Sequence, residues 1–420
     1  MLSRSALLQR ISRSSFSCPL PYLPSPPLSP YHHTQSSIHT TSSTMASGIS
    51  AQRIEAEAQH LANGTSTSIN AWASPSPSAF DFRTATTLAD DVFQEDPTTN
   101  NLETFMAKLT GKEAGLFVMS GTMGNQIAIR THLQGPPHSV VADHRAHIIE
   151  WEAGGVASLS GALIKGAVPS AGRSYVTLED VKKVTDLRDD VHGCPTKLIS
   201  LENTLGGTIM PLEETRRISE WARENGIVMH LDGARLWEAV AAQAGTLKEF
   251  CDCFDSVSLC FSKGLGAPIG SVIVGTKAFV KRSRWVRKAI GGGTRQLGVL
   301  TAAARVAVED TFLGGKLNEC HERARQIEKI WSKYGGKTTN PVETNMVWFD
   351  IEAANITAKD FIEAGQRVGL RLLGGRLVVH YQIGDEALER VDMLAQAVLK
   401  GKQLNGSVVH DVERMQITTE

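Results

Sequence analysis

Short apolar runs alternate with amphipathic stretches between residues 80 and 312. Each run is bounded by glycine, proline or polar residues, which is typical of buried strands. The predicted strands cover residues 114–119, 138–142, 197–202, 227–232, 256–261 and 271–275. Helices are predicted through about residue 133 and over residues 179–187, 212–225, 235–243 and 276–289. The alternation predicts an α/β fold, with a mostly parallel sheet and helices on both faces.

The pattern changes after two predicted helices near 296–311 and 315–333. A mixture of short strands and helices follows them, which predicts a small α+β domain over 313–400. Its strands are predicted at 345–351, 369–373 and 376–381, and its helices at 358–366 and 385–400. The large domain is predicted over 80–312. The remaining segments are an unstructured stretch at 1–48, a helix and connector at 49–79, and a tail at 401–420.

The first residues of the chain have the composition of a targeting segment. No Asp or Glu precedes Glu55, whereas Arg4, Arg10 and Arg13 lie among many serines. An arginine-bearing, serine-rich and acid-free start is typical of mitochondrial transit peptides. The alternatives are an untargeted tail, or sequence upstream of a start at Met45. A mitochondrial or cytoplasmic location is expected, and this segment favours the mitochondrial one.

Charge and cysteine usage exclude several classes of function. The 420 residues include 43 Lys and Arg against 44 Asp and Glu, so a net charge of −1 offers no electrostatic case for nucleic-acid or membrane binding. No apolar run approaches the length of a membrane span. Cys251 and Cys253 are too close for a zinc or redox pair, so reduced thiols and no metal ligands are predicted. The expected partner is a small molecule.

Two strand ends carry the residues of a candidate active site. The run that ends at Ser262-Lys263 breaks at once into glycines, which places an amine at the carboxyl end of a strand, where α/β proteins bind ligands. Lysine forms Schiff bases with carbonyl compounds, including pyridoxal phosphate. Asp232 ends the preceding strand. It could face the pyridine nitrogen of such a cofactor, although a strand-end Asp more often caps a helix.

A glycine-containing turn precedes the first large-domain helix. Gly121 and Thr122 stand where the backbone N–H groups of the helix start would point at a phosphate. A turn of this composition often binds nothing, so both interpretations stay open on the residues alone.

The glycine turn, Asp232 and Lys263 occur in the order of the large domain of fold-type I pyridoxal-phosphate enzymes. The motifs around them resemble the low-specificity L-threonine aldolases, over a span from about residue 80 to about residue 399. The motifs that carry the resemblance are residues 90–93, 95–98, 147–155, 201–204, 230–235, 262–268 and 291–296.

The resemblance implies a role for each residue that matches the family. Lys263 is similar to the Schiff-base lysine, and Asp232 to the partner of the pyridine nitrogen. His147 is similar to the imidazole that stacks on the pyridine ring, although by itself it would be read as a histidine at a helix start. Gly121 and Thr122 resemble the phosphate cradle.

The substrate and the neighbouring subunit account for the other matching residues. Arg235 resembles an arginine near the cofactor and the substrate carboxylate. Arg376 resembles the small-domain arginine that clamps this carboxylate, and Thr84 occupies a position where the family usually has serine. Lys288 and Arg295 match positions that reach the phosphate from a neighbouring subunit, so a homo-oligomer, dimer or tetramer, is expected.

The activity implied by the resemblance is pyridoxal-phosphate-dependent cleavage of L-threonine or L-allo-threonine to glycine and acetaldehyde. Another fold-type I reaction, by an aminotransferase or a β-eliminating lyase, would use the same Asp232 and Lys263. A third alternative is an inactive paralogue or splice form.

Two departures from the family pattern matter for the activity. Leu205 stands where many bacterial members have a histidine near the substrate hydroxyl, so the identity of the base stays open between His147, a phosphate oxygen and a water. Thr84 and Ala85 are followed almost at once by Asp90, without the helix that the family has here. Because extended residues reach only about 3.3–3.6 Å each, we expect Thr84 to be displaced.

Inserting the family's segment between Thr84 and Asp90 should therefore raise kcat/KM for aldol cleavage, because Thr84 would regain its reach to the substrate. Release of glycine by the restored and the unaltered chain measures the effect. Equal catalytic efficiency in the two proteins would contradict the hypothesis.

Overall fold

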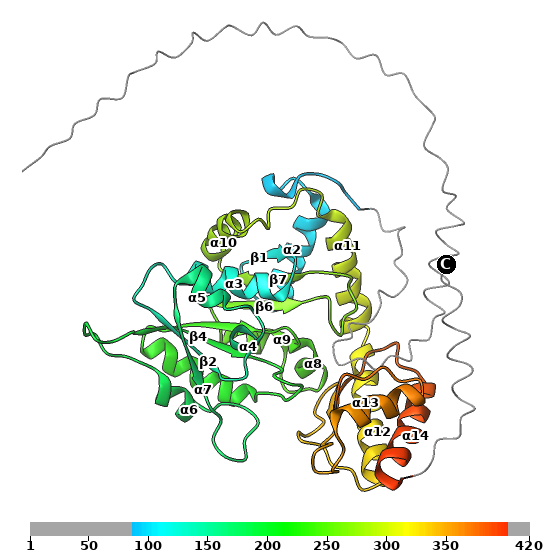
Figure 1. The fold of residues 1–420 in the computed structure, drawn as a ribbon. Helices are drawn as coiled ribbons and strands as arrows, with labels where there is room; N and C mark the ends of the chain where they lie inside the picture. The colour runs from blue at the N-terminus through cyan, green and yellow to red at the C-terminus, as the bar shows by residue number, and fades with distance from the viewer. Residues whose placement is uncertain (1–85, 402–420) are drawn as a thin grey trace, which may run out of the picture. The chain divides into compact units, whose positions relative to one another are not determined.

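The structure is a computed structural model, and it describes residues 86–401. Seven strands in this part of the chain form one sheet in the order β1-β7-β6-β5-β4-β2-β3 (Figure 1). Strands β3, β2, β4, β5 and β6 are parallel, whereas β7 is antiparallel to both β6 and β1. The strands are β1 Ala114–Val118, β2 Ser139–Asp143, β3 Leu163–Ala167, β4 Thr196–Glu202, β5 Val228–Asp232, β6 Ser256–Cys260 and β7 Ser271–Gly275. The predicted α/β class and mostly parallel sheet are confirmed.

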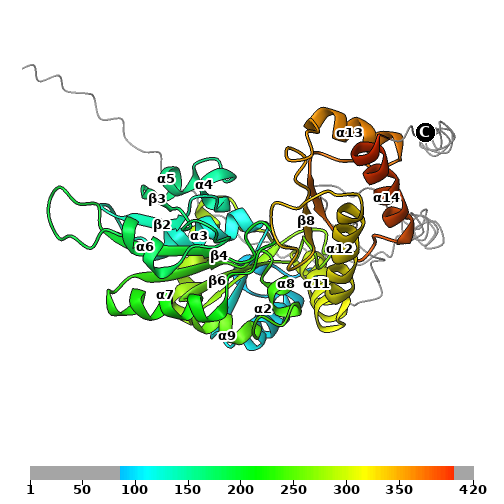
Figure 2. The same ribbon diagram turned by 90° about the horizontal axis from the view of Figure 1, so that it is seen from below.

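Helices cover both faces of this sheet. Helices α3 (Gly121–His132), α5 (Gly155–Ser160) and α10 (Lys277–Ala289) lie on one face, and the other face carries α2, α6, α7 and α9 (Figure 2). The other helices of the large part are η1 Asp91–Phe93, α2 Pro97–Thr110, α4 His147–Glu150, α6 Leu178–Val184, α7 Leu212–Glu224, α8 Leu236–Ala241, α9 Leu247–Asp252 and α11 Gly298–Ala307, which continues as a π-helix, η2 Val308–Leu313.

The core lies on both sides of the strands, because successive side chains of a strand point to opposite faces. Phe117 packs in the core beneath α2, α6, α7 and α9, whereas its neighbour Leu116 packs under α3 and α10. Val141 likewise packs in the core beneath α2, α6, α7 and α9, whereas Val140 packs on the opposite face, beneath α3 and α5. Continuous apolar runs are what a sheet covered on both faces requires.

Several helix starts follow from local sequence. In each, a Ser, Thr or Asp side chain accepts a hydrogen bond from a backbone N–H of the first turn, which satisfies a donor that has no partner within the helix. The capping residues are Asp96 for α2, Ser120 for α3, Thr177 for α6, Thr246 for α9, Thr276 for α10 and Thr357 for α13 (Ala358–Arg367).

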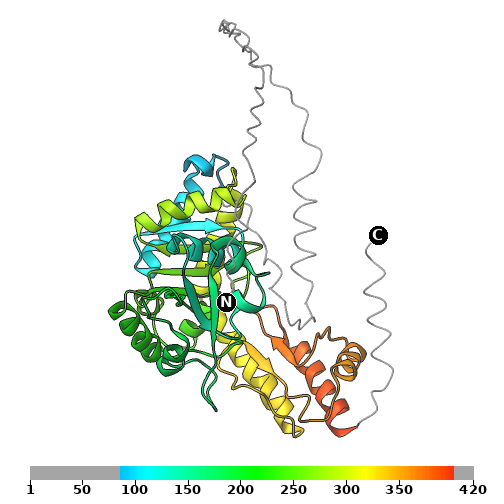
Figure 3. The same cartoon turned by 60° about the vertical axis from the view of Figure 1, so that its left-hand side comes forward.

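A second core occupies the C-terminal part of the described chain. Trp331 stacks on Phe349 at 4.2 Å between ring centroids, and Phe361 meets both rings edge-on. The two-stranded antiparallel sheet β8–β9 packs beside α12, which also contacts α14 (Figure 3). The elements are α12 Lys316–Lys333, β8 Met346–Trp348, α13 Ala358–Arg367, β9 Arg376–Val378 and α14 Asp385–Lys400. The domain boundaries given above stay a prediction.

Some of the predicted elements are wrong or were missed. Residues 369–373 form no strand: Leu370 and Leu372 are buried while Arg371 is exposed, but the segment pairs with no other strand. The alternation of apolar and polar residues at 369–373 reflects burial of the apolar side chains and does not indicate pairing with another strand. Strand β3 was missed because it lies at the sheet edge, partly exposed, and contains Lys165 and Gly166. Helix α2 was also missed. The helix predicted within 49–79 lies outside the described residues.

Two negative expectations can be checked over residues 86–401. None of the helices there combines the length and the apolar character needed to cross a bilayer. Cys194, Cys251, Cys253, Cys260 and Cys320 form no disulfide with one another in this part of the chain.

A buried ion pair ties the segment that follows residue 85 to the sheet. The Arg287 side chain donates from Nη2 to Asp91 Oδ2 at 2.7 Å and from Nη1 to the Phe117 carbonyl at 2.8 Å. Both side chains are at most 4% exposed. The sequence around Asp91 is therefore anchored through α10 to β1.

Replacing Arg287 by methionine should lower the free energy of unfolding by about 3–5 kcal/mol, because the Asp91 carboxylate would remain buried without its cation. Arg282→Met is the matched control, since Arg282 is exposed on the same helix, and it should change stability by no more than about 0.5 kcal/mol. Urea unfolding of both variants measures the difference. Equal stabilities would show that the Asp91–Arg287 pair does not hold the segment.

Candidate active site

The carboxyl ends of the parallel strands bring the predicted site residues to one edge of the sheet. Asp232 is the last residue of β5, and Glu202, the last residue of β4, is its partner in the strand register. Lys263 follows β6 after a two-residue gap, and His147 begins α4 just after β2. Open α/β sheets bind their ligands at this edge.

Asp232 is a buried acceptor within the site. Its Oδ2 accepts a hydrogen bond from Asn125 Nδ2 at 2.7 Å, and its Oδ1 accepts one from the Ala234 N–H at 3.0 Å. The next helix, α8, has Arg235 at its N-cap position, so Asp232 does not cap it. The helix-cap alternative for Asp232 is wrong.

Asn125 connects three site residues and was given no role from the sequence. Besides Asp232, its Nδ2 donates to Glu152 Oε1 at 2.9 Å, and its Oδ1 is paired with His230 Nε2 at 3.2 Å. Burial lowers the pKa of His230 to about 3, so this histidine is neutral and can donate to Asn125. The sequence offered one indication of this role. Asn125 lies in the second turn of α3 and its side chain has both donor and acceptor atoms.

His147 is oriented by two carboxylates. Its Nδ1 lies 2.8 Å from Glu152 Oε1, and its backbone N–H donates to Glu202 Oε2 at 2.8 Å. The hydrogen bond to Glu152 raises the pKa of His147 above its ordinary value, against the effect of burial and with a further contribution from the charge of Asp232. The ring is therefore fixed in one orientation and tends to be protonated.

Glu202 is a second residue that received no role from the sequence. Burial is the main cause that raises the pKa of this carboxyl to about 8, and the neighbouring negative charge of Asp232 adds to it. The His147 N–H and the positive charge of Lys263 act in the opposite direction. The signal was present, because Glu202 ends an apolar strand as Asp232 does.

The first turn of α3 is available to an anion. The Ser120 hydroxyl accepts the Met123 N–H at 3.1 Å, while the N–H groups of Gly121 and Thr122 make no hydrogen bond among the described residues. A Cβ atom at Gly121 would lie 2.7 Å from Cys260 Sγ. Glycine thus lets this helix start lie against the end of β6, close to Lys263, where the helix dipole favours a phosphate.

Two arginines that are remote in sequence lie close enough to affect each other. Arg235 follows β5, whereas Arg376 is the first residue of β9. Burial, followed by the positive charge of Arg235, lowers the pKa of Arg376 to about 10. The Arg376 guanidinium lies over the Trp348 ring at 5.4 Å. A guanidinium group matches a carboxylate in charge and geometry, so these two side chains are able to hold one.

Two predicted residues, Lys288 and Arg295, are not part of this cluster. Lys288 and Arg295 are exposed near the end of α10 and beyond it. Arg295 pairs with Asp90 at 3.6 Å, and the Lys288 ammonium group makes no hydrogen bond or ion pair with any residue between 86 and 401. Thr84 lies outside the described residues.

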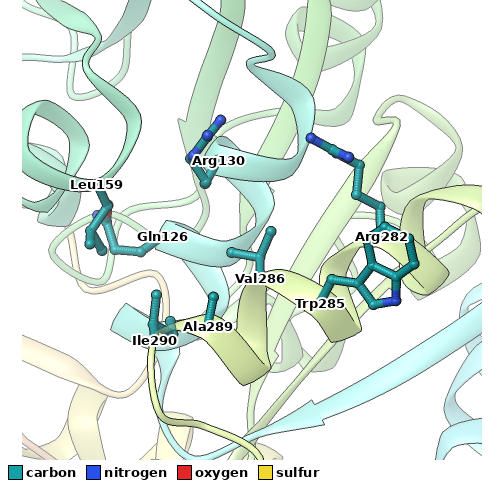
Figure 4. A pocket seen from close by; sticks show the side chains of 8 residues that line it. All are labelled: Gln126, Arg130, Leu159, Arg282, Trp285, Val286, Ala289 and Ile290. Atoms are coloured by element: carbon teal, nitrogen blue, oxygen red, sulfur yellow. The ribbon is translucent and has the colours of Figure 1, made fainter. Parts of the chain in front are cut away.

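Two other features lie near the cluster. Ligand atoms of His147, Glu152 and Asp232 lie within 4.8 Å of one another. The hydrogen bonds of Asn125 and His147 account for this proximity, so we assign no metal to it. A pocket of 270 Å³ lies between α3, α5 and α10, outside the Lys263 edge (Figure 4). It is lined by Gln126, Arg130, Leu159, Arg282, Trp285, Val286, Ala289 and Ile290.

Comparison with known proteins decides the family. Residues 71–354 match the model of the beta-eliminating lyases, which is more than half of the chain. The chain belongs to the beta-eliminating lyase family. The resemblance to low-specificity L-threonine aldolases is confirmed as well, because this lyase is 44% identical to the low-specificity L-threonine aldolase of Eremothecium gossypii over 75% of its own length and 81% of that relative.

Other relatives of this lyase have different names. It is 56% identical to aldolase vrtJ of Penicillium aethiopicum, over 81% of this chain and 91% of that one. It is 42% identical to alanine racemase TOXG of Cochliobolus carbonum, over 79% and 90%. A solved structure assigned as an L-allo-threonine aldolase of Listeria monocytogenes matches with a TM-score of 0.64 at 26% identity, over 76% of this chain and 91% of that one.

These matches confirm the fold as fold-type I and the protein as a carbon–carbon lyase whose cofactor is pyridoxal phosphate. The residues present fit this cofactor. Lys263 offers an amine that is only partly buried, Asp232 a buried carboxylate for a ring nitrogen, and α3 a helix start for the phosphate. His147 lies beside Asp232, with its ring held by Glu152.

Replacing Glu152 by glutamine should lower stability most at low pH. The folded-state pKa of His147 is raised above 6.5, so the stability contributed by its protonated ring is fully present below pH 6.5 and is lost as pH rises through the raised pKa. The difference in unfolding free energy between wild type and Glu152→Gln should therefore narrow as pH rises from 6 upward. Urea titrations at several pH values measure it. Glu150→Gln, at an exposed position of α4, should show no such trend, and a constant difference in Glu152→Gln would refute the pairing.

Proposed function

We propose that this lyase cleaves L-threonine or L-allo-threonine to glycine and acetaldehyde. The observation that carries the proposal is the gathering of Lys263, Asp232 and His147 at one strand edge, in a chain that shares 44% identity with a low-specificity L-threonine aldolase. The Arg235–Arg376 pair supports an amino-acid substrate, because it offers two guanidinium groups to one carboxylate.

Each residue of the site has a defined part in this reaction. The cofactor, when bound, takes up the electron pair of the bond that breaks at Cα. Asp232 would keep the ring nitrogen positively charged, because opposite charges stabilise each other in a buried site. Lys263 would hold the cofactor before the substrate arrives. Arg376 and Arg235 would orient the substrate by its carboxylate, and the chosen orientation decides which bond at Cα breaks.

The relative named alanine racemase TOXG supports a second candidate function. A racemase would remove the Cα hydrogen and return it on the other face, without breaking a carbon–carbon bond. An aminotransferase or β-eliminating lyase would instead form an oxo acid. An inactive paralogue would bind the cofactor and turn over none of these substrates.

We infer a homo-oligomer in which Lys288 and Arg295 serve a neighbouring subunit. Their exposure on the α10 side, away from the Lys263 cluster of their own chain, supports this arrangement. We also propose a mitochondrial location on the arginine- and serine-rich composition of residues 1–48.

Incubating the cofactor-loaded protein with L-threonine and L-allo-threonine should release glycine and acetaldehyde in equal amounts. Lys263→Ala should abolish the release together with the visible absorbance of the bound cofactor, whereas Lys277→Ala, at an exposed lysine of α10, should leave both unchanged. Coupled aldehyde reduction and amino-acid analysis measure the products. Formation of an oxo acid, or conversion of L-alanine to D-alanine without aldehyde, would assign the protein to one of the other reactions.

A further inference from the structure

The base that accepts the substrate's hydroxyl proton is the part of the site that the family pattern does not supply. Leu205, at the position where many bacterial members have histidine, pairs with Thr208 across a tight turn. Gly206 and Gly207 take φ values of 61° and 87° in this turn, a conformation that glycine adopts readily. The turn is held by the C-terminal part of the chain, since the Gly206 carbonyl accepts Trp348 Nε1–H at 2.7 Å. The turn therefore holds Leu205 in a defined position, and its side chain cannot act as a base.

Glu202 borders the same small cavity as Leu205. This cavity of 10 Å³ lies at the carboxyl ends of β2 and β4, and its other lining residues are Asp143, Ser174, Tyr175, Val176, Leu201, Thr208 and Met210. Among these, Asp143 has both carboxylate oxygens bound to Arg145, at 2.9 and 2.7 Å. The Tyr175 hydroxyl is bound to Arg173. Glu202 is thus the lining carboxylate that keeps an oxygen available.

The orientation of Glu202 suits proton transfer within the site. Its register partner is Asp232, and neighbours in a parallel sheet point to the same face. One oxygen, Oε2, accepts the His147 N–H at 2.8 Å, whereas Oε1 makes no hydrogen bond among the described residues. The side chain is only partly buried. Glu202 is therefore anchored by one oxygen while the other can receive a proton.

The charges around Glu202 let it change protonation state near neutrality. Burial and the charge of Asp232 on β5 raise the pKa of this carboxyl to about 8, while His147 on α4 and Lys263 after β6 oppose the rise. Arg145 and Arg235 also interact with its charge. A base is most effective when its pKa lies near the working pH. His147 is a poorer acceptor, because its bond to Glu152 favours the protonated ring.

We propose that the Glu202 carboxylate is the base that takes the proton from the β-hydroxyl group of the substrate. This inference rests on the aldol cleavage proposed above. The O–H bond breaks and its proton passes to Glu202, the oxygen forms the aldehyde C=O, and the Cα–Cβ bond breaks with its electron pair left on Cα. Cα then takes a proton from the Lys263 ammonium group, and glycine results. Glu202 returns its proton to water, from which the Lys263 amine is protonated again.

The test compares Glu202→Gln with the wild-type holoenzyme in two reactions. Glutamine can still accept the His147 N–H, but it cannot take up a proton. Aldehyde release from L-threonine and L-allo-threonine should fall about 10²- to 10⁴-fold. The kcat of wild type should rise with pH, and the kcat of Glu202→Gln should not. Exchange of the Cα hydrogen of glycine in D₂O, followed by proton NMR, should stay within about twofold, because this reaction involves no hydroxyl group and uses Lys263.

Two further variants and a cofactor-free measurement complete the test. Glu202→Asp should recover part of the aldehyde release. Glu103→Gln is the matched control, because the Glu103 carboxyl also has a raised pKa and also accepts a backbone N–H, that of Phe117, but lies outside the cluster. The kcat of this variant should stay within about twofold of wild type. Without cofactor, Tm of Glu202→Gln relative to wild type should rise between pH 5 and pH 9. The protonated carboxyl stabilises wild type below the unfolded-state pKa, and this stability is lost as pH rises to about 8.

The outcomes separate this proposal from the proposed function. If wild type releases aldehyde and Glu202→Gln releases it equally fast, Glu202 is not the base. Equal loss of aldehyde release and of glycine exchange would also overturn the proposal, since Glu202 would then act on binding. If Glu202→Gln does not fold, Glu202→Asp takes its place in the test. The proposal would be overturned if Glu202→Asp had the same kcat as Glu103→Gln and the same pH profile as wild type. A wild-type protein that exchanges glycine but releases no aldehyde would sink the proposed function, and the role of Glu202 with it.

Discussion

The burial of several charges at one edge of the sheet is the constraint on which the site depends. Asp232 and Glu152 are buried carboxylates and Glu202 is a partly buried one, and an unpaired buried charge costs several kcal/mol. These negative charges are stabilised by hydrogen bonds with the Asn125 amide and the His147 ring, and by the nearby positive charge of Lys263. Each of these partners comes from a different strand end or helix start, so the site exists only when the whole sheet is assembled.

The C-terminal part of the described chain completes this site. His321 on α12 is paired with Glu238 on α8 at 2.8 Å, and both side chains are nearly inaccessible. A Cβ atom at Gly264 would lie 2.3 Å from Glu238 Oε1, so only glycine fits between this pair and Lys263. The same packing brings Arg376 within electrostatic reach of Arg235. The positions of Arg235 and Arg376 are therefore coupled to the loop that carries Lys263.

Much of the architecture could be predicted because buried strands have a local signature. Six apolar runs matched strands within a few residues, since both faces of the sheet are covered and nearly every position of these strands is buried. Strand β3 was not predicted, because this edge strand is less buried than the central strands and its residues are less apolar. The strand predicted at 369–373 failed because alternation of buried and exposed residues does not supply a pairing partner.

By itself, the sequence determined which chemistry is present: an amine and a carboxylate at two strand ends, a glycine turn at a helix start, and the motifs of one family. These features are local, so they can be read along the chain. Only the tertiary structure decided that Asn125 links Asp232 to Glu152 and that Glu202 lies beside both Asp232 and the turn of Leu205. These contacts join residues that are far apart in the chain. The pKa values of the side chains depend on burial and on neighbouring charges, which no single segment of sequence encodes.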